Sequence, residues 1–117
     1  MKAILTNTRT IKDGDSEVQL TEFQLGRYEI EETVETYTDG SEDVDFDIRQ
    51  DWREKYLPEI YYEKRFGAKI GKFEIMTTSW GSLPPEEIEI VIAGYREAQE
   101  AVAALEKLRD AACAGIK

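Results

Sequence analysis

The chain has 117 residues, of which 25 are acidic, 15 are basic and none is His, so its net charge at neutral pH is −10. This size suits a single domain spanning residues 1–117, and this charge argues against free nucleic acid and anionic membrane as partners. With one Cys and no apolar stretch near the roughly 20 residues of a membrane span, we expect a cytoplasmic protein without an intramolecular disulfide.

The first 80 residues are predicted to be rich in β-structure. The first predicted strand covers residues 2–12 and leads into an Asp-Gly pair, which is a strong signal for a hairpin turn. In the second strand, residues 17–25, the apolar side chains change face between Leu20 and Phe23. That change indicates a bulge or a twist within this strand.

Residues 28–48 alternate between apolar and acidic side chains around a predicted turn at 38–41, a period typical of half-buried strands. Nine acidic residues and no Lys or Arg lie between positions 28 and 47. The apolar residues expected to point inward are Tyr28, Ile30, Val34, Val44, Phe46 and Ile48. The acids expected to share the outward face, and to bind a partner, are Glu29, Glu31, Glu35, Asp43, Asp45 and Asp47.

After a predicted connection at 50–59, a third hairpin is expected from residues 60–66 and 70–79. Its predicted inward side chains are Tyr61, Phe73 and Ile75. Adjacent strand residues face opposite ways, so one member of the Tyr61–Tyr62 pair is expected to be exposed. Exposed Tyr beside basic residues is typical of interfaces, and the secondary candidates for partner binding are Tyr61, Tyr62, Lys64 and Arg65.

Residues 84–113 are predicted to form one long helix. Pro85 suits its first turn, and apolar side chains follow at helical spacing from Ile88 to Ala112. About 28 helical residues reach roughly 42 Å, whereas an eight-residue strand reaches only about 27 Å. We therefore expect the helix to overhang the sheet, its Ala-rich end to need a second surface, and the protein to form a homodimer through this helix. The predicted fold is α+β, with an antiparallel sheet of about five or six strands packed by this helix.

The motifs argue against an enzyme, a cofactor and a metal site. Asp43, Asp45 and Asp47 resemble the start of a calcium loop, but Ile48 stands where that loop requires Gly. The glycines and lysines of residues 67–72 have the wrong spacing for a phosphate loop. Without His, and with Cys113 near the helix end, no catalytic triad is evident. We therefore predict no catalytic residues.

Rows of carboxylates along strands can imitate rows of phosphates, because Lys and Arg that grip phosphate also grip carboxylate. The chain resembles the small acidic inhibitors of host defence encoded by phages and mobile elements, of the anti-CRISPR and anti-restriction kind. The resemblance lies in size, acidity and α+β pattern, and no motif residue carries it. It implies a non-enzymatic inhibitor that occupies a basic, nucleic-acid-binding surface of a protein such as a defence nuclease.

Three other interpretations remain open. The protein could be an oligomeric binder of a small anionic ligand such as a nucleotide, in a pocket lined by Lys64, Arg65, Lys69 and Lys72 with Tyr61 or Tyr62. It could be a structural component of a mobile-element particle. The acidic face could also be a solvated surface that serves solubility alone.

Overall fold

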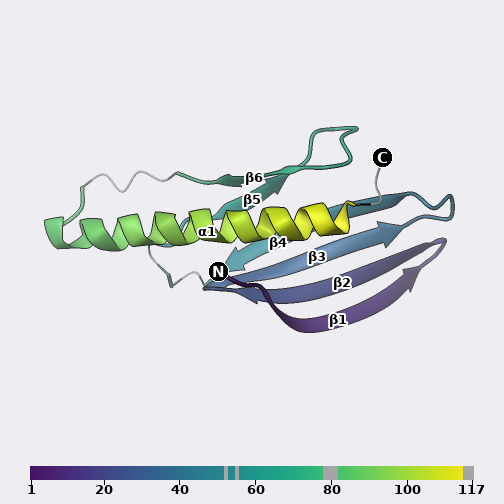
Figure 1. Ribbon diagram of the computed structural model, residues 1–117, viewed down its shortest axis with the longest axis horizontal. Helices are drawn as coiled ribbons and strands as arrows, with labels where there is room; N and C mark the ends of the chain where they lie inside the picture. Colours follow the sequence, from purple (N-terminus) through teal and green to yellow (C-terminus); the bar gives the residue numbers. More distant parts are fainter. Residues whose placement is uncertain (52, 55, 78–81, 115–117) are drawn as a thin grey trace.

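The computed structural model describes residues 1–51, 53–54, 56–77 and 82–114, and within these ranges the chain has six strands, one short 3-10 helix and one α-helix (Figure 1). The 3-10 helix is η1 (Pro85–Glu87) and the α-helix is α1 (Ile88–Ala112). The predicted α+β class, with hairpins followed by a long C-terminal helix, is confirmed. The strands are β1 (Ile4–Asp13), β2 (Ser16–Leu25), β3 (Tyr28–Thr36), β4 (Glu42–Gln50), β5 (Ile60–Glu63) and β6 (Lys72–Ile75).

The strands form two sheets instead of the single sheet expected. Strands β1 to β4 make an antiparallel meander in the order β1-β2-β3-β4, which we call the main sheet, and β5 pairs only with β6 among the described strands. The chain leaves β4 through residues 51–59 before the second sheet begins. There Leu57 and Pro58 are buried and Tyr28 donates a 2.6 Å hydrogen bond to the Pro58 carbonyl, so this segment is part of the core.

Strand register explains the change of face in β2. The pairing of β2 with β3 is continuous, with Leu20 opposite Thr33 and Phe23 opposite Ile30. Leu20 and Phe23 therefore lie on opposite faces without any bulge in β2. The register shift of the main sheet lies instead in β1, between Leu5 and Asn7.

The core lies between α1 and one face of the main sheet, which we call the inner face (Figure 1). The predicted inward residues of β3 and β4 are confirmed, because four of them are buried and Val34 and Ile48 pack against the core. The fully buried side chains of Ala98, Ala101 and Leu105 supply the helix side of this contact. The buried cluster is Leu25, Tyr28, Ile30, Val44, Phe46, Leu57, Ile60, Ala98, Ala101, Leu105 and Cys113.

The third hairpin faces the core with Tyr62, so the assignment of Tyr61 to the inside was wrong. The register pairs Ile60 with Ile75 and Tyr62 with Phe73, which puts these four residues on the core side and leaves Tyr61 exposed. The rings of Tyr62 and Phe73 lie 4.9 Å apart, and both contact Phe46 of β4 at 5.1 and 5.4 Å. This aromatic cluster joins β5 and β6 to the main sheet.

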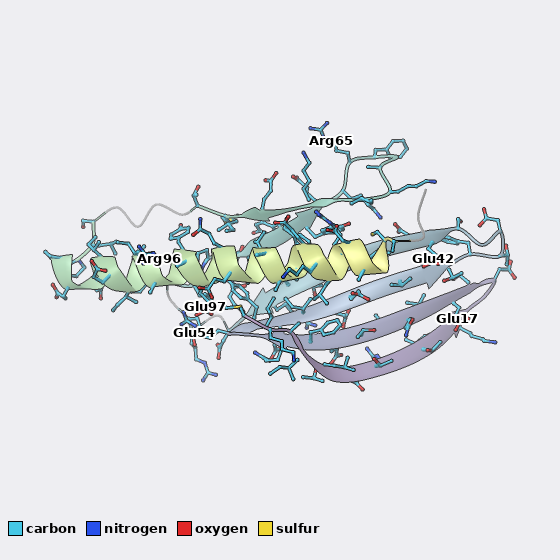
Figure 2. All side chains as sticks on the ribbon, in the orientation of Figure 1. Glu17, Glu42, Glu54, Arg65, Arg96 and Glu97 are labelled. Atoms are coloured by element: carbon cyan, nitrogen blue, oxygen red, sulfur yellow. The ribbon has the colours of Figure 1, made fainter. Side chains whose placement is uncertain are left out.

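Two contacts fix the middle of α1. A Cβ atom at Gly94 would lie 2.1 Å from the Tyr56 carbonyl oxygen, so the helix touches the backbone of the connecting segment there. Arg27, in the turn between β2 and β3, pairs with Glu97 at 3.1 Å and with Glu54 at 2.6 Å. The two carboxylates are labelled in Figure 2. The helix is thus held to both the turn and the segment after β4.

The helix does overhang the sheet, but at the end opposite to the one expected. Its N-terminal half extends past the ends of the main-sheet strands, and its Ala-rich C-terminal half lies over the inner face (Figure 1). Small Ala98 and Ala101 allow a close approach to the sheet, which explains why this half is the covered one. The offset between helix and sheet contributes to an elongated molecule of 56 × 29 × 22 Å.

Candidate protein-binding surface

The outer face of the main sheet, opposite α1, carries the predicted row of acids. In the pairing of β3 with β4, Glu31 lies opposite Asp47 and Glu35 lies opposite Asp43. Side chains on one face of a strand repeat at about 6.8 Å, and neighbouring strands lie about 4.8 Å apart. These positions form two aligned rows of carboxylates. We call them the acidic face, which consists of Glu29, Glu31, Glu35, Asp43, Asp45 and Asp47.

A seventh carboxylate, from β2, joins these rows. Glu22 lies opposite Glu31, so Glu22, Glu31 and Asp47 are neighbours across three strands. The sequence reading missed Glu22 because it precedes the run of acids. The alternation within β2 was the available signal, since Glu22 shares its face with Leu20. A groove of about 390 Å³ on this face is lined in part by Glu22, Glu29 and Arg49.

Two cations, Arg49 and Lys64, form ion pairs with acids of this face within the same chain. Arg49 lies 3.7 Å from Glu31 and 3.3 Å from Asp47. Lys64 reaches over from the end of β5 to pair with Asp43. Each ion pair between exposed side chains contributes at most about 1 kcal/mol to the free energy of unfolding. Seven acids against these two bases still leave the surface of β2, β3 and β4 strongly negative.

Apolar side chains border the acids on the same face. Ile11 of β1 lies opposite Val18 of β2, and Leu20 follows two residues later. Ile11 is 45% exposed and Val18 is half-buried, whereas Leu20 is buried at 9% exposure although it lies outside the core cluster. An apolar strip next to charged residues is the composition of many protein–protein interfaces. The outer face is therefore suited to a protein partner.

Three of the nine acids of the run, Glu32, Asp39 and Glu42, do not belong to the acidic face. Glu32 lies on the inner face, opposite Phe46 and Thr21, and is half-buried. Burial raises its pKa above the usual value for Glu, and burial also raises the pKa of the nearby Cys113 thiol. Glu32 therefore adds charge to the rim of the core and cannot contribute to binding on the opposite face.

The four secondary candidates are not brought together. Tyr62 is in the aromatic cluster and accepts a 2.7 Å hydrogen bond from the Gly71 amide, whereas Tyr61 points outward and donates to Glu59. Lys64 pairs with Asp43, and Arg65 projects from the tip of the hairpin, away from the body of the protein (Figure 2). The four side chains therefore do not meet at one point, and the anion pocket lined by Lys64, Arg65, Lys69 and Lys72 with Tyr61 or Tyr62 stays a prediction.

Comparisons with protein-family models, with curated proteins and with solved structures find no match to this chain. In the described part of the chain, no helix is long and apolar enough to span a membrane. Within the same residues, no group of three or more Asp, Glu, Cys or His side chains is arranged to hold a metal ion.

Proposed function

We propose that this protein is a non-enzymatic inhibitor that binds the basic, nucleic-acid-binding surface of another protein, such as a nuclease of a host-defence system. The observation that carries the proposal is the register of β3 and β4, which aligns six carboxylates on one uncovered face of the sheet. Lys and Arg side chains that bind phosphates make equally good charge-assisted hydrogen bonds to carboxylates. A row of carboxylates can therefore compete with a nucleic-acid backbone.

The rigidity of the acidic face supports this role. The residues that alternate with the acids, such as Ile30, Val44 and Phe46, are buried in the core and hold the strands in place. Carboxylates on such strands lose less conformational freedom on binding than carboxylates on a flexible tail, and the affinity is correspondingly higher.

The charge pattern also indicates what the partner must look like. A matching surface carries several Lys or Arg side chains and, beside them, an apolar patch that covers Ile11 and Val18. Such complementary charge speeds association and makes binding sensitive to salt, because exposed charges are screened beyond about 8 Å at physiological ionic strength.

The test uses two variants that each remove three negative charges. The acidic-face variant is Glu31→Gln, Asp45→Asn and Asp47→Asn. The control changes exposed acids on β5, β6 and α1, and is Glu63→Gln, Glu74→Gln and Glu100→Gln. Each tagged protein is used to capture proteins from a bacterial lysate at low salt, and bound proteins are eluted with a salt gradient or with double-stranded DNA.

The expected result is capture of a basic nucleic-acid-binding protein that DNA displaces, by the wild type and the control but not by the acidic-face variant. Both variants should keep the native circular dichroism spectrum, because like charges on one sheet face destabilise it and their removal does not. Equal capture by all three proteins would refute the proposal. A nucleotide released on denaturation would favour the anionic-ligand interpretation instead.

A further inference from the structure

The apolar side chains of α1 point in two different directions along its length. Residues of a helix advance by about 100° each. On that basis Gly94, Ala98, Ala101 and Leu105, which are buried, share the side that faces the core. Of the apolar residues of the N-terminal half, Ile88, Ile92 and Tyr95 lie roughly 110° away from that side, whereas Ile90 and Val91 lie about 50° from it, one on each flank. None of Ile88, Ile92 and Tyr95 belongs to the core cluster of the described residues.

Ile92 and Tyr95, with Val91, form one wall of an open groove beside β6, and Ile88 lies one helical turn before Ile92 on the same side. Ile88 is 43% exposed and Ile92 is 39% exposed. The groove has a volume of about 340 Å³, and Ile75 and Thr77 line its other wall. It lies on the overhanging half of the helix (Figure 1), where the main sheet provides no cover.

We call Ile88, Ile92, Tyr95 and Gln99 the seam, and their spacing matches that of a helix that packs against another helix. Ile88, Ile92, Tyr95 and Gln99 are separated by four, three and four residues, which is the a/d spacing of coiled coils. Glu89 and Arg96 are exposed, lie seven residues apart, and follow Ile88 and Tyr95 on the same flank of the seam, the flank away from the core.

This arrangement is self-complementary for an antiparallel pair of helices. When two copies of the seam meet around a two-fold axis between Ile92 and Tyr95, each flank meets the same flank of the other copy. Glu89 of one chain then comes opposite Arg96 of the second chain, and symmetry makes the pair twice. Arg96 lines the groove and lies on the N-terminal half of α1 (Figure 2), within reach of such a partner.

We propose that the N-terminal half of α1 is a homodimer interface, in which two copies pack antiparallel through Ile88, Ile92 and Tyr95 and exchange two Glu89–Arg96 ion pairs. This seam, from residue 88 to residue 99, is only about 18 Å long. The interface is therefore at the small end of the range for specific complexes, and dissociation in the micromolar range is expected.

The first test measures the oligomeric state by sedimentation equilibrium from about 1 to 200 µM. The wild type should show a reversible monomer–dimer equilibrium, and the Ile88→Glu, Ile92→Glu variant should be monomeric throughout. The matched control, Ile4→Glu with Ile11→Glu, changes two isoleucines of β1 that are exposed to a similar or greater extent, and it should dimerise as the wild type does. A monomeric wild type at 200 µM, or a dimeric seam variant, would overturn the proposal.

A charge exchange tests the antiparallel geometry. Glu89→Arg alone and Arg96→Glu alone should each weaken the dimer about tenfold or more, because both symmetric pairs become repulsive. The double variant restores opposite charges and should dimerise within about threefold of the wild type. Failure of the double variant to recover would overturn the antiparallel arrangement.

This interface is independent of the acidic face. The Glu31→Gln, Asp45→Asn, Asp47→Asn variant should dimerise as the wild type does, since those residues lie on the opposite side of the main sheet from α1. Loss of partner capture with an intact dimer would therefore bear on the proposed function alone. Loss of the dimer with intact capture would bear on the seam alone.

Discussion

At the scale of single residues, Gly94 sets how closely α1 approaches the segment after β4. Glycine inside a helix usually lowers stability by about 0.5–1 kcal/mol relative to alanine, so a glycine at this position calls for a structural explanation. The reason is steric, because a Cβ atom there would lie 2.1 Å from the Tyr56 carbonyl oxygen. That oxygen belongs to the backbone and cannot turn away as a flexible side chain can.

We predict that Gly94→Ala destabilises the protein by about 1–3 kcal/mol, the usual cost of overpacking, in spite of the better helix propensity of alanine. Urea denaturation monitored by circular dichroism measures this change. The control is Ala93→Gly at the neighbouring exposed position, where propensity alone should cost about 1 kcal/mol. A more stable Gly94→Ala variant would show that the helix does not touch this segment.

Sequence periodicity predicted the orientation of most strand residues but not their partners. The alternation in β3 and β4 was enough to place Ile30 inward and Glu31 outward. The adjacent Tyr61 and Tyr62 could not be assigned in the same way, because both are amphipathic and only the pairing with β6 decides between them. The pairing of Lys64 with Asp43 joins residues 21 positions apart, and local pattern holds no information about it.

At the scale of elements, the aromatic cluster is what attaches β5 and β6 to the rest of the fold. Tyr62 and Phe73 both pack on Phe46 edge to face and on each other at a tilt, and the Arg109 guanidinium lies 5.8 Å from the centre of the Phe73 ring. Arg109 also donates a 3.1 Å hydrogen bond to the Gly71 carbonyl. The cluster thus joins the hairpin to β4 on one side and to α1 on the other.

We predict that Phe73→Ala lowers the free energy of unfolding by about 2 kcal/mol. This is somewhat less than the same substitution at a fully buried Phe would cause, because the Phe73 ring is only half-buried. Phe66→Ala, in the turn of the same hairpin, should change stability by less than about 0.5 kcal/mol because its side chain is fully exposed at 108%. Denaturant midpoints of the two variants test this contrast. Equal midpoints would mean that the cluster does not hold the hairpin.

The elements themselves could be predicted because their signals are local. Turn residues between alternating segments marked the hairpins, and helical spacing with Pro85 marked α1. The division into two sheets could not be predicted, because it depends on the buried segment that contains Leu57 and Pro58. The overhang was predicted from helix length alone, which does not say which end is covered, and Ala98 and Ala101 of the C-terminal half are among the most buried residues.

At the scale of the whole molecule, a net charge of −10 on 117 residues opposes folding through self-repulsion. The ion pairs of Arg49, Lys64 and Arg27 act in the other direction. Salt screens both effects, with a Debye length that falls from about 30 Å at 0.01 M to about 10 Å at 0.1 M. Repulsion within the acidic face acts over several strand spacings and is screened more completely than contacts at about 3 Å. The loss of repulsion should therefore dominate the effect of salt on the free energy of unfolding.

We predict that the free energy of unfolding rises as NaCl increases from about 0.01 to 0.5 M, and that the Glu31→Gln, Asp45→Asn, Asp47→Asn substitutions reduce this rise. Thermal unfolding is measured in the Ile88→Glu, Ile92→Glu background, so that self-association cannot contribute. The Glu63→Gln, Glu74→Gln, Glu100→Gln control removes the same net charge from dispersed sites and should reduce the rise less. Stability that falls with salt would mean that the ion pairs outweigh the repulsion, and that the acidic face costs the fold little.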